Sequence, residues 1–108
     1  MYNAMANKKY YVVFQYSHDD DYYADTIGIF SSLESANQKI IDTIKEEYDK
    51  LDECDIMQIT DEWFPDKNEE YLPKWKDFLK IINKNLKRRE SIGLSYLTYK
   101  IGVHELEK

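Results

Sequence analysis

The sequence predicts an α+β domain in which two amphipathic helices pack on one face of a three- or four-stranded antiparallel sheet, in the order β-β-α-(β)-α-β. Two observations carry this prediction: strand-like alternation of apolar residues at both ends of the chain and helix-like periodicity between them. With 108 residues, 43% of them hydrophobic, the chain can build one core. We therefore expect a single domain over residues 9–108, preceded by a flexible arm over residues 1–8.

The first two strands are expected near the start of the chain. Aromatic and β-branched residues alternate over Lys9–Ser17, which is typical of a strand on a pleated surface. Residues 18–23 favour turns, and Asp25–Phe30 resumes the strand pattern, so we expect a hairpin with a long loop. Gly28 indicates a bulge or a close contact in the second strand.

Two helices are expected in the middle of the chain. Ser31 and Glu34 fit a capping box, in which each side chain accepts a hydrogen bond from the backbone amide of the other residue. The apolar stripe that follows ends near Asp52. Pro73 suits the first turn of a second helix. Gly93, just beyond that helix, is expected to take the left-handed conformation that ends many helices.

The remaining segments are expected to add one or two strands. Residues 53–72 are the least regular part of the chain, and their short apolar patch predicts a strand over Asp55–Thr60. Alternation returns over Leu94–Leu106 and predicts the last strand. The side chains on one face of that last strand would be Leu97, Tyr99, Ile101 and Val103.

Charge is segregated along the chain. Between Asp19 and Glu70 there are seventeen acidic residues and four lysines, a net charge of −13. From Lys74 to Glu90 there are seven basic residues and two acidic ones, a net charge of +5. The basic cluster either compensates the end of a helix or grips phosphate. Because the whole chain carries −6, we expect no direct nucleic-acid partner. The cluster consists of Lys84, Lys87, Arg88 and Arg89.

Side chains suited to catalysis or metal binding are few. His18 and the aspartates beside it could hold a divalent cation or could form a solvated loop. Asp66 opens a calcium-loop pattern that fails, because Tyr71 stands where glycine is needed and Asp77 where glutamate is needed. Cys54 is the single cysteine, and nothing in the spacing brings it to a histidine. We therefore expect no cofactor, no metal site and no enzymatic activity.

The sequence also predicts a cellular location. A single cysteine excludes a disulfide framework within the chain and fits a reducing compartment. No apolar run reaches the length of a membrane span or follows the pattern of a secretory signal. We therefore expect a cytoplasmic protein without a membrane partner.

Three segments carry a resemblance to known proteins. They are the opening strand with Val12-Val13, the segment Ile27–Ala36 (IGIFSSLESA), and the final strand ending Val103–Glu107. Together they resemble a group of small uncharacterised bacterial and phage proteins, in which a hairpin leads into a Ser-capped helix and an acidic strand closes the fold. The likeness covers about half the chain and implies no activity, because the group has none assigned.

Two clusters combine acidic and aromatic residues and suggest a binding surface. Aromatic rings anchor protein interfaces, and carboxylates around them steer a basic partner toward the site. The rings of the second cluster could instead cover the core. The clusters are Asp19, Asp20, Asp21, Tyr22 and Tyr23 in the expected hairpin loop, and Asp61, Glu62, Trp63, Phe64 and Asp66 in the middle segment.

The leading hypothesis from these residues is a non-catalytic inhibitor that blocks a basic surface of another protein. A toxin-neutralising immunity protein and a phage anti-CRISPR inhibitor of a nucleic-acid-guided defence enzyme are two such proteins. The alternative is a small ligand-binding protein or metal-dependent enzyme that uses His18 and the neighbouring carboxylates. An uncovered sheet face could also form a homodimer.

Overall fold

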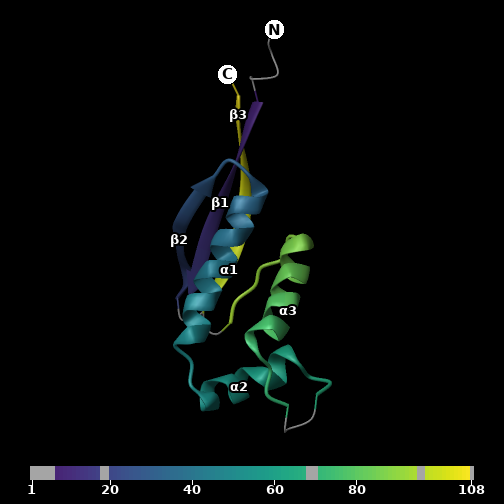
Figure 1. Cartoon of the computed structure of the whole chain (residues 1–108). Helices are drawn as coiled ribbons and strands as arrows, with labels where there is room; N and C mark the ends of the chain where they lie inside the picture. Colours follow the sequence, from purple (N-terminus) through teal and green to yellow (C-terminus); the bar gives the residue numbers. More distant parts are fainter. Residues whose placement is uncertain (1–6, 18–19, 68–70, 95–96, 108) are drawn as a thin grey trace.

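A computed structural model describes residues 7–17, 20–67, 71–94 and 97–107 of the chain. It confirms the predicted α+β class, with a three-stranded antiparallel sheet and three helices where two were expected (Figure 1). The elements follow one another in the order β-β-α-α-α-β. They are β1 (Asn7–Ser17), β2 (Asp20–Phe30), α1 (Leu33–Asp49), α2 (Glu53–Trp63), α3 (Trp75–Lys87) and β3 (Leu97–Glu107).

The strand order β2-β1-β3 places the first strand in the centre of the sheet. β1 pairs with β3 along its whole length, from Asn7 opposite Glu107 to Ser17 opposite Leu97. Its pairing with β2 reaches only as far as Tyr11, which lies opposite Phe30. The ends of β1 and β3 therefore project beyond β2 and α1 as a two-stranded ribbon (Figure 1), and the molecule measures 61 × 28 × 21 Å.

The hairpin differs from its prediction. Asp20 already pairs with Ser17, so β2 begins at Asp20 and the long loop predicted over residues 18–23 is wrong. The bulge expected at Gly28 is confirmed, because Val13 pairs with Gly28 while Phe14 pairs with Thr26. β1 begins at Asn7, two residues earlier than predicted.

The strand predicted over Asp55–Thr60 is wrong, because these residues belong to helix α2. Asp52 caps this helix: its carboxylate accepts a hydrogen bond from the Asp55 amide at 2.8 Å. The Asp55 carboxylate accepts in turn from the Asp52 amide at 3.3 Å, which completes a capping box. Ile56, Ile59 and Trp63 then pack against the core with helical spacing. The cap and this spacing select a helix over a strand.

The starts of the other two helices are shifted by one or two residues from their predictions. Ser32 caps α1 in place of Ser31, since its hydroxyl oxygen accepts from the Ser35 amide at 3.1 Å. Pro73 lies before the cap of α3 and is buried, so it is not a residue of the first turn. Lys74 is the cap residue, and its backbone N–H donates to the Asp77 carboxylate at 2.8 Å.

The end of α3 also differs from its prediction. Gly93 does not have a positive φ; Arg89 does, at 61°. The Arg89 amide donates to the Leu86 carbonyl, and the Glu90 amide donates to the Asn85 carbonyl, at 3.0 and 2.9 Å. This is the Schellman arrangement of hydrogen bonds, with arginine where glycine is preferred.

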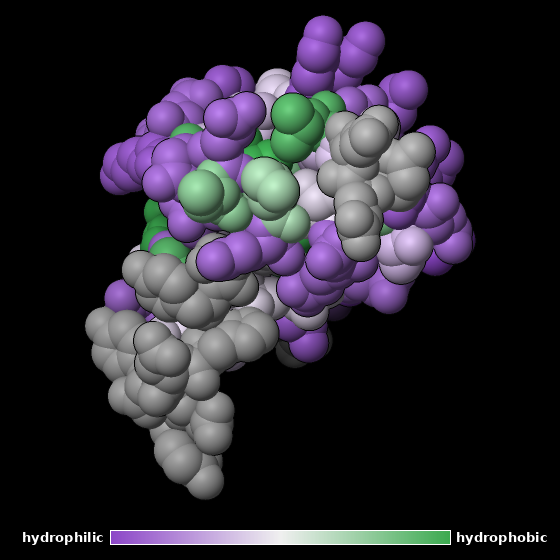
Figure 2. All heavy atoms as spheres, turned by 90° about the horizontal axis from the view of Figure 1, so that it is seen from below, coloured by the Kyte–Doolittle hydropathy of each residue, from purple (hydrophilic) through white to green (hydrophobic). Residues whose placement is uncertain are grey.

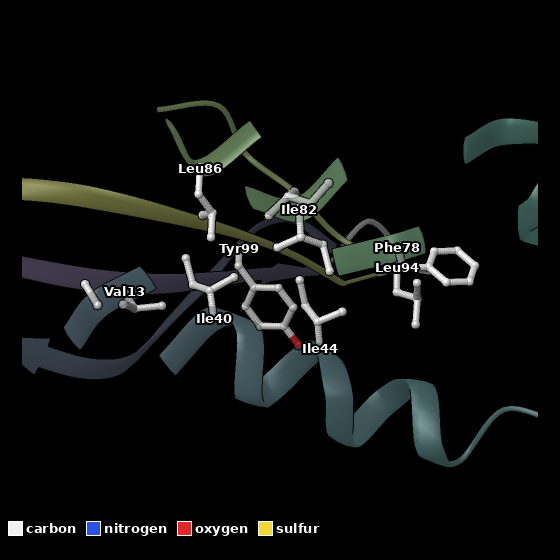
Figure 3. Packing of buried hydrophobic residues seen from close by; sticks show 10 residues of the cluster. Val13, Ile40, Ile44, Phe78, Ile82, Leu86, Leu94 and Tyr99 are labelled. Carbon is white, nitrogen blue, oxygen red and sulfur yellow. The ribbon is translucent and has the colours of Figure 1, made fainter. Parts of the chain in front are cut away.

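One face of the sheet and the three helices enclose the core. Val13 and Tyr99 point from the sheet toward Ile40 and Ile44 of α1, and all four are fully or almost fully buried (Figure 3). Phe78, Ile82 and Leu86 enter the same cluster from α3. The predicted face of β3 is confirmed for Leu97, Tyr99 and Ile101, whereas Val103 is 46% exposed beyond the reach of α1.

Tyr99 also links strand β3 to helix α1 through a part-buried carboxyl group. Its hydroxyl donates to the Glu47 carboxylate of α1 at 2.5 Å. Burial raises the pKa of the Glu47 carboxyl above its ordinary value of 4.5, while this hydrogen bond and the charge of Lys50 act in the opposite direction. The carboxyl group therefore holds its proton more tightly in the folded protein than in the unfolded chain.

Within the described residues no helix packs over the opposite face of the sheet, and we call it the open face. Residues directly opposite each other in an antiparallel ladder point to the same side, so the register identifies its members. None of them belongs to the core cluster, although Val12 is buried, with 9% of its surface exposed. The members with described side chains are Lys8, Tyr10, Val12, Phe14, Tyr16, Ala24, Thr26, Ile29, Thr98, Lys100, Gly102 and His104.

Candidate binding surfaces

The first predicted acidic and aromatic cluster does not form a free loop. Asp19, like His18, lies outside the described residues. The backbone of Asp20, Asp21, Tyr22 and Tyr23 belongs to strand β2, and the side chains of these four residues lie outside the described part of the structure. The cluster therefore lies at the start of a strand.

The second cluster divides into exposed acids and half-buried rings. Asp61, Glu62 and Asp66 are exposed. Trp63 packs edge-on against Phe78, with 5.1 Å between ring centroids, and Phe64 does the same at 5.2 Å. Both rings thus cover one end of the core, as the second interpretation of this cluster allowed. Truncating either ring would remove core packing as well as any contact with a partner.

The calcium-loop pattern is not assembled either. Asp66 is exposed after the end of α2, whereas Asp77 lies in the first turn of α3. The backbone hydrogen bond from Lys74 lowers the pKa of the Asp77 carboxyl, which fits its capping role. Across the described residues, no group of three histidine, cysteine or acidic side chains could hold a metal ion. Cys54 is exposed.

The exposed acids gather on α1 and α2, and we call this region the acidic surface. Lys45 interrupts it but is paired with Asp49 at 2.5 Å. Within it, Met57 is 54% exposed and Cys54 is also exposed. Figure 2 views the molecule from the α2 end and shows a few apolar side chains among hydrophilic ones. The acidic surface comprises Asp42, Glu46, Asp49, Asp52, Glu53, Asp61 and Glu62.

A groove of about 750 Å³ runs along the edge of the open face. It is bounded by β1 and β3, by the end of α2, by α3 and by residues 91–93. Ile92 holds this last segment beside β3, because it exchanges backbone hydrogen bonds of 3.0 and 2.8 Å with Tyr99. The lining side chains that carry polar groups are Tyr16, Glu62, Trp63, Asn85, Ser91, Thr98 and Lys100.

Gly93 makes the groove wall possible. A Cβ atom at this position would lie 1.9 Å from the Leu97 carbonyl oxygen and 2.8 Å from the Thr98 Cα. Both atoms belong to the backbone, so neither can turn aside as a side chain could. The glycine serves a close backbone approach here, and not the helix end that was predicted.

The groove and the open face were not predicted from the sequence. The groove depends on the Ile92 bridge and on how α2 meets α3, which no local pattern encodes. The open face had a signal: apolar and aromatic residues occur on both sides of β1, at Tyr10 and Phe14 as well as at Tyr11 and Val13. A strand with only one covered side does not need the second set for its core.

Comparison with known proteins identifies the family. The model of a domain of unknown function, DUF7336, matches residues 8–67, and the chain belongs to this family. The match covers β1, β2, α1 and α2, while α3 and β3 lie outside it. No curated protein and no solved structure matches the chain. No helix in the described part of the chain is both long and apolar enough to cross a membrane.

Proposed function

We propose that this member of the DUF7336 family is a non-catalytic binding protein that covers a basic surface of another protein with its acidic surface. The observation that supports this proposal most strongly is that α2 combines exposed carboxylates with an exposed apolar side chain. Asp61 and Glu62 are exposed beside Met57, which is 54% exposed. Carboxylates raise the rate of encounter with a basic partner, and an apolar side chain gains affinity when contact removes it from water.

Helix α2 is suited to this role because it is held in place from its inner side. Its capping box fixes the first turn, and Ile56, Ile59 and Trp63 pack against the core. The outer side chains are thus presented by a helix whose inner side is anchored to the core, which lowers the entropy cost of binding. Methionine is unbranched and adapts to the shape of a partner surface.

The proposal extends to the class of partner. A basic groove that normally holds nucleic acid is the natural counterpart of an acidic surface, because both ligands are attracted by the same charges. We therefore propose a cytoplasmic inhibitor, either a phage anti-CRISPR protein or a toxin-neutralising immunity protein. The resemblance to small phage and bacterial proteins supports this choice. Occupying such a groove requires no catalytic group.

Charge reversal on α2 tests the proposal. Tagged wild-type protein and the double variant Asp61→Lys/Glu62→Lys would be used to capture proteins from a host carrying defence and toxin systems. The matched control is Glu105→Lys, which makes the same kind of charge change at an exposed residue of β3. A basic protein held by wild type and control but lost by the double variant is the expected result. Equal capture of that protein by all three would contradict the role of α2.

A second candidate function is ligand binding in the groove. Its volume of about 750 Å³ is in the range of pockets that hold small ligands, and it combines Trp63 with an amide, hydroxyls and the Lys100 ammonium group. Ligand binding is the alternative function predicted from the sequence, but its site was expected around His18. The groove lies at a different place. Calorimetric titration with nucleotides and with magnesium, manganese and zinc ions would show saturable heat for wild type. Heat that persists unchanged in Lys100→Ala would exclude the groove as the site.

A further inference from the structure

The open face carries a row of aromatic rings that the core does not use. Tyr10, Phe14 and Tyr16 lie on one side of β1 and are only partly buried. The ring centroids of Phe14 and Tyr16 are 6.3 Å apart. A Cβ atom on Gly102 would lie 2.7 Å from the Phe14 ring, so this ring leans across β3 over the space that a side chain would fill. The rings thus form a platform over the two strands.

The charge of the open face is opposite to that of the whole chain. Lys8 and Lys100 are exposed there, together with the His104 imidazole, and no side chain described on this face is acidic. Among the exposed acids of α1 and α2, Glu62 lines the groove beside this face, and the others lie on helices that are not part of it. The net charge of −6, which argued against nucleic acid in the sequence, therefore does not describe this side of the molecule.

The groove continues the open face toward the basic helix α3. Tyr16, Thr98 and Lys100 belong to both, and Ile81 and Asn85 line the groove from α3. Helical spacing places Arg88 three residues after Asn85 and seven after Ile81, on the same side of α3, with Lys84 next to it. Lys84 and Arg88 are exposed. Cations thus flank the rings along one edge, where Arg88 is paired with Glu90 at 4.0 Å and Glu62 also lines the groove.

We infer that the open face and its groove bind single-stranded nucleic acid. Unpaired bases can stack on Phe14 and Tyr16, whose spacing along a strand suits successive bases of an extended chain. The backbone phosphates would lie near Lys100, Lys84 and Arg88. The Asn85 amide, which lines the groove, can hydrogen-bond to base edges. A duplex would fit poorly, because its bases are already stacked on one another.

This inference goes beyond the acidic surface and depends on the groove proposed as the second candidate site. A symmetric dimer through the open face is disfavoured, because the lysines of two copies would meet there without described carboxylates to pair with. An acidic polypeptide could satisfy the lysines but has no bases to stack on the rings. The rings therefore favour nucleic acid over an acidic polypeptide. The test distinguishes the contribution of the rings to binding from that of the charges.

The test is fluorescence anisotropy with labelled twelve-nucleotide oligo(dT) and oligo(U) at 50 and 200 mM salt. Wild type is expected to bind, and to bind a duplex of equal length more weakly. Phe14→Leu keeps an apolar side chain but removes the stacking surface, and should weaken binding by about ten-fold or more. Lys100→Gln and Lys84→Gln should each reduce the slope of log K against log salt by about 0.7. Lys76→Gln, the same change at an exposed residue in the first turn of α3, eight residues before Lys84, should bind as wild type.

Tyr16→Leu serves as a second ring variant. Thermal unfolding of each variant shows whether it is still folded, so that a loss of binding can be assigned to the lost contact. The inference is overturned by wild type that does not bind either oligonucleotide. It is also overturned if both ring variants bind as wild type, or if poly-glutamate competes as well as oligo(dT). Loss of binding in Asp61→Lys/Glu62→Lys but not in Lys100→Gln would place the site elsewhere. Oligonucleotide binding that depends on the rings and on Lys100 supports the open face as the site, whether or not the acidic surface binds a basic protein.

Discussion

The two faces of the sheet differ in what their side chains do. On the covered face, Val13 and Tyr99 are almost fully buried against α1 and α3 and unite segments distant in sequence. On the open face, Phe14 and Tyr16 lie outside the core cluster and Ile29 is 64% exposed. Folding and binding thus use alternate residues of the same strands. Substitutions one position apart should therefore have unlike consequences.

The largest effect should come from a core ring compared with an exposed side chain on the open face. Phe78 is fully buried beneath Trp63 and Phe64, so Phe78→Ala should lower the free energy of unfolding by about 3–5 kcal/mol. Ile29→Ala should lower it by about 0.5 kcal/mol or less. Urea denaturation would measure both. Comparable losses would mean that the open face also contributes to the core.

Two glycines sharpen the comparison. Gly93→Ala forces a Cβ atom against backbone atoms and should cost about 2–3 kcal/mol, with loss of the bridge between Ile92 and Tyr99. Gly102→Ala brings its Cβ atom close to side chains alone, at 2.7 Å from the Phe14 ring, which can swing toward solvent, and should cost about 1 kcal/mol or less. Chemical denaturation and amide exchange of Tyr99 provide the measurements. A larger cost for Gly102→Ala would mean that the Phe14 ring is fixed.

The Glu47–Tyr99 pair allows a test of the covered face by pH. Because the pKa of Glu47 is raised on folding, the folded state binds this proton more tightly than the unfolded state does. The resulting contribution to stability is complete below the unfolded value of 4.5 and is lost as the pH rises through the folded pKa. Glu47→Gln, which can still accept the Tyr99 hydrogen bond, should remove this decline. Glu46→Gln is the exposed control and should retain it.

The smallest expected effect distinguishes backbone conformation from side-chain charge as the source of stability at the end of α3. Arg89 has φ of 61°, so Arg89→Gly should raise the free energy of unfolding by about 1 kcal/mol. Arg88 has φ of −86°, so Arg88→Gly should lower it by up to about 1 kcal/mol. Both variants remove one positive charge, and thermal unfolding at one salt concentration compares them. Equal shifts would point to charge and not to the backbone.

The sequence predicted those elements whose patterns are local. Alternation located β1 and β3, and the apolar stripe and the serine pair located α1 to within three residues. Helix α2 was missed because the apolar patch at Ile56, Met57 and Ile59 suits either element, and the deciding signal was the pair Asp52 and Asp55. That pair is a cap of two aspartates, a less common form than Ser with Glu.

The binding surfaces could be predicted only in part. Charge segregation indicated the acidic surface, but Trp63 and Phe64 turned out to contact Phe78, which lies fourteen or more residues further along the chain. The open face runs along β1, which lies in the centre of the sheet. β1 is central because β3 pairs with the edge of β1 that β2 leaves free. Neither contact is encoded in a local pattern. Long-range packing therefore decides which aromatic side chains remain accessible.

The open face is thus assigned to binding and the covered face to folding. A ¹H–¹⁵N NMR titration of the full chain with unlabelled oligo(dT) distinguishes the two faces most directly. We expect concentration-dependent shifts in amides of β1, β3 and α3 around Phe14, Tyr16, Lys100 and Asn85, with α1 and the first turn of α2 unmoved. Shifts confined to α1 and the first turn of α2, or no shifts at all, would contradict this division between the faces.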